Sequence, residues 1–82
     1  MSVSSARYDL LISDLHLIHA NMLSAVQNGT ATYASLCQSR DLMVEKYRIV
    51  KEKVSLFYFS FFKEQKVKGL IKEADELIEK MR

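Results

Sequence analysis

The sequence lacks proline and tryptophan, and it holds only two glycines and one cysteine among 82 residues. So few glycines and prolines argue against a β-sandwich or barrel, because those folds need many tight turns. They also exclude collagen-like chains and disordered chains rich in these two residues. A chain this short has room for one hydrophobic core. We therefore expect a single all-α domain, residues 1–82, with few breaks.

Long apolar runs and disulfide partners are also missing. Cys37 is the single cysteine, so we interpret its side chain as a small core residue in a reducing compartment. The N-terminal residues lack the basic start and apolar core of a signal peptide. The longest apolar run, residues 54–62, is shorter than the ~20 residues that span a bilayer. These features favour a cytoplasmic protein.

Charge of one sign does not dominate. The formal net charge is +2, from 12 basic and 10 acidic residues, which is too balanced to indicate a nucleic-acid partner. Residues 1–39 carry only Arg7, Asp9 and Asp14, whereas the second half is rich in Lys and Glu. The solvent-facing sides of the helices must therefore consist mainly of uncharged polar residues in the first half and of Lys and Glu in the second half.

An amphipathic pattern predicts a first helix over residues 5–27. Its large apolar residues recur at steps of three and four, which places them on one face: Tyr8, Leu11, Ile12, Leu15, Ile18, Met22, Ala25 and Val26. Leu10, Leu17 and Leu23 are expected to widen that face. Asn28 and Gly29 tolerate the left-handed conformation that ends helices, so we predict a turn over 28–30 and an antiparallel second helix.

The second helix is predicted over residues 31–63. Thr30 or Thr32 is suited to cap it, with Ser39 as a rival start. Its apolar residues alternate between steps of three and four, which is typical of a coiled-coil-like seam: Tyr33, Leu36, Met43, Tyr47, Val50, Val54, Phe57 and Phe61. Arg40 interrupts this seam and Glu64 ends it.

A third apolar stripe follows over residues 66–82, offset by one residue from the seam. The offset indicates either a kink or break near 63–69 or a rotated stripe on one continuous helix. Gly69 marks a weak point, since glycine costs about 1 kcal/mol in a helix interior. Two architectures remain: a helical hairpin closed by a third helix as a small bundle, or a long helix from residue 31 to the C-terminus.

Residues 54–62 hold apolar side chains around nearly the whole helix circumference. They fit the centre of a three-helix core or a docking surface for a partner; a β-strand is disfavoured because the chain offers no strand to pair with it. The residues that we expect to contact a partner combine this segment with the C-terminal stripe: Tyr47, Val54, Phe57, Tyr58, Phe61, Phe62, Leu70, Leu77 and Ile78.

No catalytic motif, phosphate-binding loop or zinc-ligand spacing is present, so we expect neither an enzyme nor a bound cofactor or metal. His16 and His19 share one helix face, but few carboxylates lie near them in sequence. We expect a scaffold, assembly subunit or chaperone-like adaptor that packs its apolar helix faces on itself or on another protein. The alternative is a peripheral membrane protein using residues 54–62 and the flanking lysines.

Overall fold

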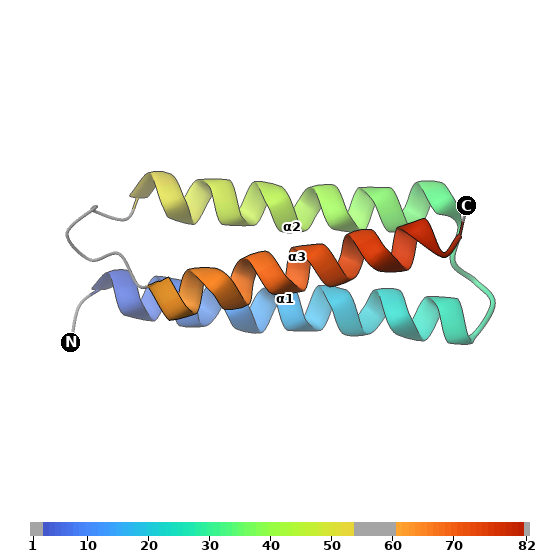
Figure 1. Cartoon of the computed structure of the whole chain (residues 1–82), viewed down its shortest axis with the longest axis horizontal. Coiled ribbons are helices and arrows are strands. Elements are labelled where there is room, and N and C mark those ends of the chain that lie inside the picture. Colours follow the sequence, from blue (N-terminus) through green and yellow to red (C-terminus); the bar gives the residue numbers. More distant parts are fainter. Residues whose placement is uncertain (1–2, 54–60, 82) are drawn as a thin grey trace.

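The computed structural model describes residues 3–53 and 61–81, and these form three α-helices (Figure 1). Helix α1 spans Val3–Gln27, α2 spans Tyr33–Lys53 and α3 spans Phe61–Glu79. The expected all-α fold is therefore confirmed. Residues 54–60, which include Val54, Phe57 and Tyr58, lie outside the described part of the chain.

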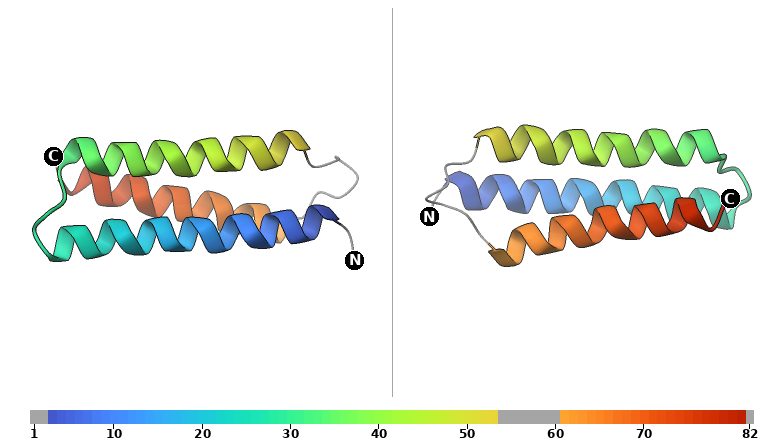
Figure 2. Two further views of the ribbon diagram at one scale, coloured as in Figure 1. Left: turned by 180° about the vertical axis from the view of Figure 1, so that it is seen from behind. Right: turned by 45° about the horizontal axis from the view of Figure 1, so that its top comes forward.

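The three helices lie side by side in an elongated bundle. Helix α2 runs antiparallel to α1, and α3 returns in the direction of α1 (Figures 1 and 2). Each helix packs against both of the others. The bundle measures 43 × 18 × 17 Å, so its length is close to that of a single 25-residue helix, about 37 Å.

One continuous helix from residue 31 to the C-terminus is not what the structure shows. Helix α2 is described to Lys53, and α3 begins at Phe61 and packs back against α1 and α2. Residues 63–69, where the sequence suggested a kink or break, lie inside α3 and are helical, with Gly69 among them. The offset stripe has a simple physical reason, because it is the face that α3 turns toward the other two helices.

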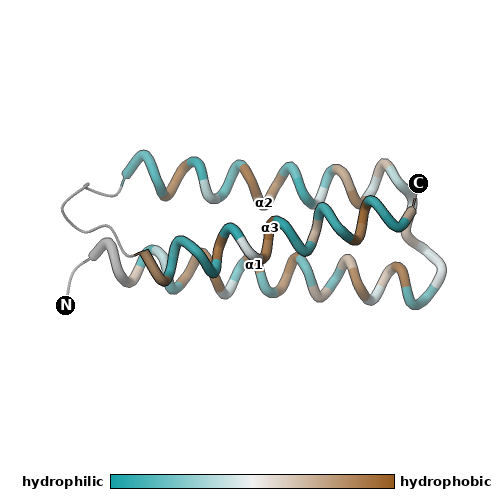
Figure 3. Tube along the Cα trace, in the orientation of Figure 1, coloured by the Kyte–Doolittle hydropathy of each residue, from teal (hydrophilic) through white to brown (hydrophobic). Residues whose placement is uncertain are grey.

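The core is built from the predicted stripes of all three helices. Its buried residues are Tyr8, Leu11, Leu15, Met22, Leu36, Met43, Val67, Leu70, Ala74, Leu77 and Ile78. Figure 3 shows hydrophobic positions recurring along each helix among hydrophilic ones. Cys37 is half-buried and packs against this core as a free thiol. The stripe predicted for the first helix is thus confirmed.

Three leucines of α1 depart from the prediction. Leu10, Leu17 and Leu23 do not extend the buried face but remain 68%, 62% and 38% exposed. Leu10 lies about 100° around the helix from Leu11, and the two neighbouring helices of a small bundle cover only one stripe. The helix therefore carries apolar side chains on its outer side as well.

The turn between α1 and α2 forms as predicted. Gly29 adopts a positive φ of 73°, and the N–H of Thr30 donates to the carbonyl of Ala25, which closes α1 in a Schellman arrangement. Thr32 is the cap of α2. Its backbone N–H donates to Ser35 Oγ, and the Ser35 N–H donates back to Thr32 Oγ1, each at 3.0 Å.

Ion pairs connect each pair of helices. They are Asp14–Lys46 between α1 and α2, Asp9–Lys63 between α1 and α3, and Arg40–Asp75 between α2 and α3, with N–O distances of 3.9, 2.7 and 3.0 Å. Arg40, which interrupts the apolar seam of α2, therefore reaches a carboxylate of α3. Exposed pairs of this kind contribute little stability each, about 0–1 kcal/mol, but they favour one register of the helices.

Candidate interaction surface

The expected partner contacts divide into three groups. Val54, Phe57 and Tyr58 lie outside the described residues. Phe61 and Phe62 begin α3 and are 58% and 80% exposed, with their rings edge to face at 5.9 Å between centroids. Both rings are therefore accessible to another molecule. Such a contact would be favourable, because moving a large aromatic side chain out of water lowers the free energy.

The C-terminal stripe belongs to the chain's own core. Leu70, Leu77 and Ile78 are at most 7% exposed and pack inside the bundle. The physical reason is that α3 folds back onto α1 and α2, so the apolar face that the sequence assigned to a partner is covered intramolecularly. These three side chains are therefore not part of a surface in this fold.

Tyr47 is half-buried and has a specific intramolecular partner. Its hydroxyl donates a hydrogen bond to Glu64 Oε1 on α3. Glu64 is 2% exposed and is the one charged side chain buried among the described residues. Its second oxygen, Oε2, has no hydrogen-bond partner in the described part of the chain. The residue that ends the apolar seam in the sequence is thus a buried polar link between two helices.

Two lysines complete the surroundings of Glu64. Lys51 Nζ lies 3.3 Å from Oε1 and Lys68 Nζ lies 3.9 Å from it. Burial raises the pKa of the Glu64 carboxyl, but the hydrogen bonds from Tyr47 and Lys51 and the positive charges of both lysines outweigh it, so this pKa lies below its ordinary value. The group is therefore a carboxylate at neutral pH.

The same cluster acts on two tyrosines. Burial raises the pKa of Tyr47, and its hydrogen bond to the Glu64 carboxylate raises that pKa further. Burial and the charge of Glu64 also raise the pKa of Tyr8 on α1. Both phenols therefore stay protonated well into the alkaline range. The cluster is a polar contact within the core that joins α2 to α3.

An exposed apolar surface lies on the outer side of α1 and α2. It is formed by Leu10 and Leu17 of α1 and by Leu42 and Ile49 of α2, with exposed fractions of 68%, 62%, 48% and 39%. We call these four residues the α1/α2 face. Within each helix the two residues are seven apart, so they lie on nearly the same side.

A groove lies at the end of this face that Leu10 and Ile49 form; Leu17 and Leu42 do not line it. It has a volume of about 300 Å³ and is lined by Arg7, Leu10, Leu11, Asp14, Lys46, Ile49 and Val50. Its floor is apolar and its edges carry charges of both signs. This face was not predicted from the sequence, although the spacing of seven in Leu10–Leu17 and Leu42–Ile49 was a signal that could have indicated a second stripe.

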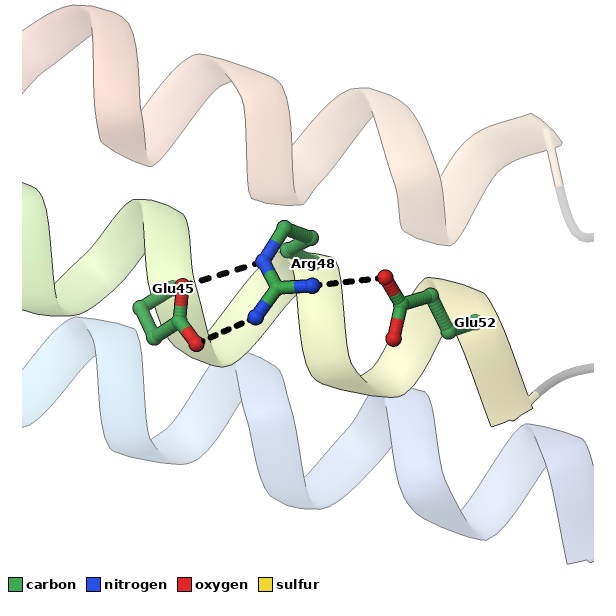
Figure 4. A network of polar contacts seen from close by, with 3 residues as sticks. All are labelled: Glu45, Arg48 and Glu52. Atoms are coloured by element: carbon green, nitrogen blue, oxygen red, sulfur yellow. Dashed lines mark hydrogen bonds and ion pairs between the residues drawn. The ribbon is translucent and has the colours of Figure 1, made fainter.

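A network of ion pairs lies along an exposed side of α2. Arg48 bridges Glu45 and Glu52, with 3.0 Å from Nε to Glu45 Oε2 and 2.6 Å from Nη1 to Glu52 Oε1 (Figure 4). These bonds raise the pKa of Arg48, mainly through Glu45, and lower the pKa of Glu45 itself. The network holds both acidic side chains along the exposed edge of α2.

The two histidines of α1 lie toward α3. His19 Nδ1 is 3.8 Å from Glu73 Oε2, and His16 lines a separate shallow pocket beside Lys66 and Gly69. Across residues 3–53 and 61–81, no cluster of three or more His, Cys, Asp or Glu side chains is arranged to hold a metal ion.

Comparison with known proteins gives no relative: no family model, curated protein or solved structure matches the chain. Within the part of the chain that the structure describes, no helix combines the length and apolar character required to cross a membrane. The candidate surface is therefore inferred from the exposed side chains and the groove alone.

Proposed function

We propose that this chain is a small helical interaction module that packs an exposed apolar helix face on another helical surface. The observation that carries the proposal is the α1/α2 face, where four large aliphatic side chains are exposed and two of them, Leu10 and Ile49, line a groove. Clustered exposed apolar side chains with a polar rim are typical of protein-binding surfaces. A scaffold, an assembly subunit and a chaperone-like adaptor would all use such a surface.

The proposal is tested by a matched pair of variants in the cell from which the sequence comes. The full chain is tagged, and bound proteins are identified and then purified for direct binding. The variant Leu10→Lys/Leu17→Lys changes the α1/α2 face, whereas Leu23→Lys places a lysine on the α3 side of α1. We expect one helical protein, this chain or another, to bind wild type and Leu23→Lys and to lose binding to the double variant. Equal recovery with all three would contradict the proposal.

Phe61 and Phe62 support a second candidate function, attachment to a membrane surface. Both rings are exposed at one end of the bundle, and Lys63 and Lys66 follow them closely. Aromatic side chains beside lysines suit the boundary between lipid headgroups and acyl chains. Vesicles rich in anionic lipid should then bind the protein at low salt and release it at high salt. The variant Phe61→Ser/Phe62→Ser should abolish this binding. If wild type does not bind these vesicles at low salt, this second function is ruled out.

A further inference from the structure

The charged side chains of the bundle are unevenly distributed between its two ends. Helices α1 and α3 begin at one end, and the described part of α2 finishes there (Figures 1 and 2). Residues 3–14, 46–53 and 61–68 form the half of the bundle at this end, and they hold eight basic and four acidic side chains. The other half, residues 15–45 and 69–81, holds three basic and six acidic side chains. The first half, which we call the basic end, is therefore positively charged, and the other half is negatively charged.

Three cations of the basic end make no ion pair with a described residue. They are Arg7 of α1, Lys53 of α2 and Lys66 of α3, one from each helix, and all three are exposed. The other five basic side chains of this end each lie at most 3.9 Å from a carboxylate oxygen of the chain. The three remaining positive charges are therefore available to an anionic partner.

The exposed aromatic pair belongs to the same end. Phe61 and Phe62 begin α3 and are 58% and 80% exposed. Lys66 lies four residues after Phe62, which places both side chains on the same side of α3. Exposed rings beside lysines are typical of segments that bind at the boundary between lipid headgroups and acyl chains. The basic end thus combines apolar side chains that favour leaving water with positive charge around them.

The size of the basic end favours a lipid surface over a protein partner. A bundle with a cross-section of 18 × 17 Å presents at its end less than the about 800 Å² that each partner contributes to a stable protein interface. A bilayer requires no surface of complementary shape, since single aromatic rings enter the headgroup layer while cations stay among the headgroups.

We infer that the basic end docks on an anionic lipid surface with the long axis of the bundle pointing away from it. Phe61 and Phe62 would enter the headgroup layer, and Arg7, Lys53 and Lys66 would lie beside the lipid phosphates. This inference rests on the second candidate function, membrane attachment, and gives it a lipid class and an orientation. The acidic half points outward because an anionic surface repels negative charge.

The first test compares two matched variants on vesicles. The full chain is mixed with vesicles of phosphatidylcholine alone or with added phosphatidylserine, and we expect binding to the anionic vesicles that weakens as salt rises. Lys53→Gln/Lys66→Gln should weaken this binding about 10- to 30-fold, whereas Lys72→Gln/Lys80→Gln, which removes the same charge from the acidic half, should weaken it less than about threefold. Circular dichroism should show unchanged helical content in both variants, because all four lysines are exposed. Equal weakening by the two variants would overturn the role of the basic end.

The second test measures the orientation on the vesicle. Cys37→Ser removes the single native thiol, and a fluorescent label is then attached through Gln65→Cys at the basic end or Met81→Cys at the opposite end; both positions are exposed. On anionic vesicles the label at position 65 should be shielded from the aqueous quencher iodide. The label at position 81 should stay as accessible as in the free protein. Equal shielding of both labels would mean that the bundle lies flat and would overturn the orientation.

The failure of this inference is distinguishable from the failure of membrane attachment itself. If wild type binds anionic vesicles at low salt but the two lysine variants or the two labels behave alike, membrane attachment stands and the inference is wrong. If wild type does not bind these vesicles at low salt, both are wrong. The proposed protein-interaction module is affected by neither result, because it uses the α1/α2 face.

Discussion

The hydroxyl of Tyr47 donates a hydrogen bond to the buried carboxylate of Glu64 and thereby joins α2 to α3. The two residues are 17 positions apart in sequence, on either side of residues 54–60. A buried carboxylate is costly unless its oxygens are hydrogen-bonded or paired with opposite charge. Tyr47, Lys51 and Lys68 supply these contacts at Oε1, so the position of α3 depends on this end of α2.

Replacing Tyr47 with phenylalanine should destabilise the bundle. Tyr47→Phe removes one donor from a carboxylate that stays buried, which costs about 1–3 kcal/mol. Urea unfolding followed by circular dichroism measures the change. Tyr33→Phe is the matched control, because Tyr33 is 44% exposed at the start of α2, and its change should stay within about 0.5 kcal/mol. Equal effects of the two variants would show that the Glu64 contact contributes nothing specific.

Acid should weaken the fold through Glu64. Its folded-state pKa is lowered, so the carboxylate contributes stability that is complete above the ordinary glutamate pKa of 4.5 and is lost as the pH falls through the lower folded value. Unfolding free energies measured between pH 7 and pH 3, a range set by ordinary carboxyl pKa values of roughly 4, should decline less steeply for Glu64→Gln than for wild type. Parallel curves for the two proteins would contradict this assignment.

Local signals in the sequence were enough to predict α1 and the first turn. The stripe from Tyr8 to Met22 has the period of a helix, and Gly29 supplies the positive φ that ends it. The sequence offered Thr30 or Thr32 as the cap of α2, with Ser39 as a rival, and the reciprocal bonds between Thr32 and Ser35 identify Thr32 as the cap. Each of these features depends on residues within a few positions of one another.

Features that depend on distant residues were not predictable in the same way. The sequence did not reveal that a separate helix begins at Phe61, because the apolar residues 54–62 contain no proline or glycine and continue the helical period. The burial of Leu70, Leu77 and Ile78 follows only once α3 is known to fold back. Likewise, no spacing rule relates Tyr47 to Glu64, since their contact depends on the relative placement of two helices.

The two glycines should respond in opposite directions to alanine. Gly29→Ala places a Cβ at a φ of 73° and should destabilise the chain by about 1 kcal/mol. Gly69 lies inside α3, and a methyl group added to its Cα would meet no atom within 4 Å, so Gly69→Ala should stabilise the chain by about 0.5–1 kcal/mol. Thermal unfolding of the two variants tests this, and a destabilised Gly69→Ala would mean that the inner part of α3 is under strain.

Leu15 and Leu17 of α1 are two residues apart but lie on different sides of the helix. Leu15 belongs to the core and Leu17 to the α1/α2 face. Leu15 is fully buried, so Leu15→Ala should leave a cavity and cost about 2–5 kcal/mol. Leu17 is 62% exposed, so Leu17→Ala should change the stability of the isolated chain by no more than about 0.5 kcal/mol. The comparison requires dilute protein, because any association that buries Leu17 would add concentration-dependent stability. A large loss for Leu17→Ala in dilute protein would place this side chain in the core and remove it from the surface.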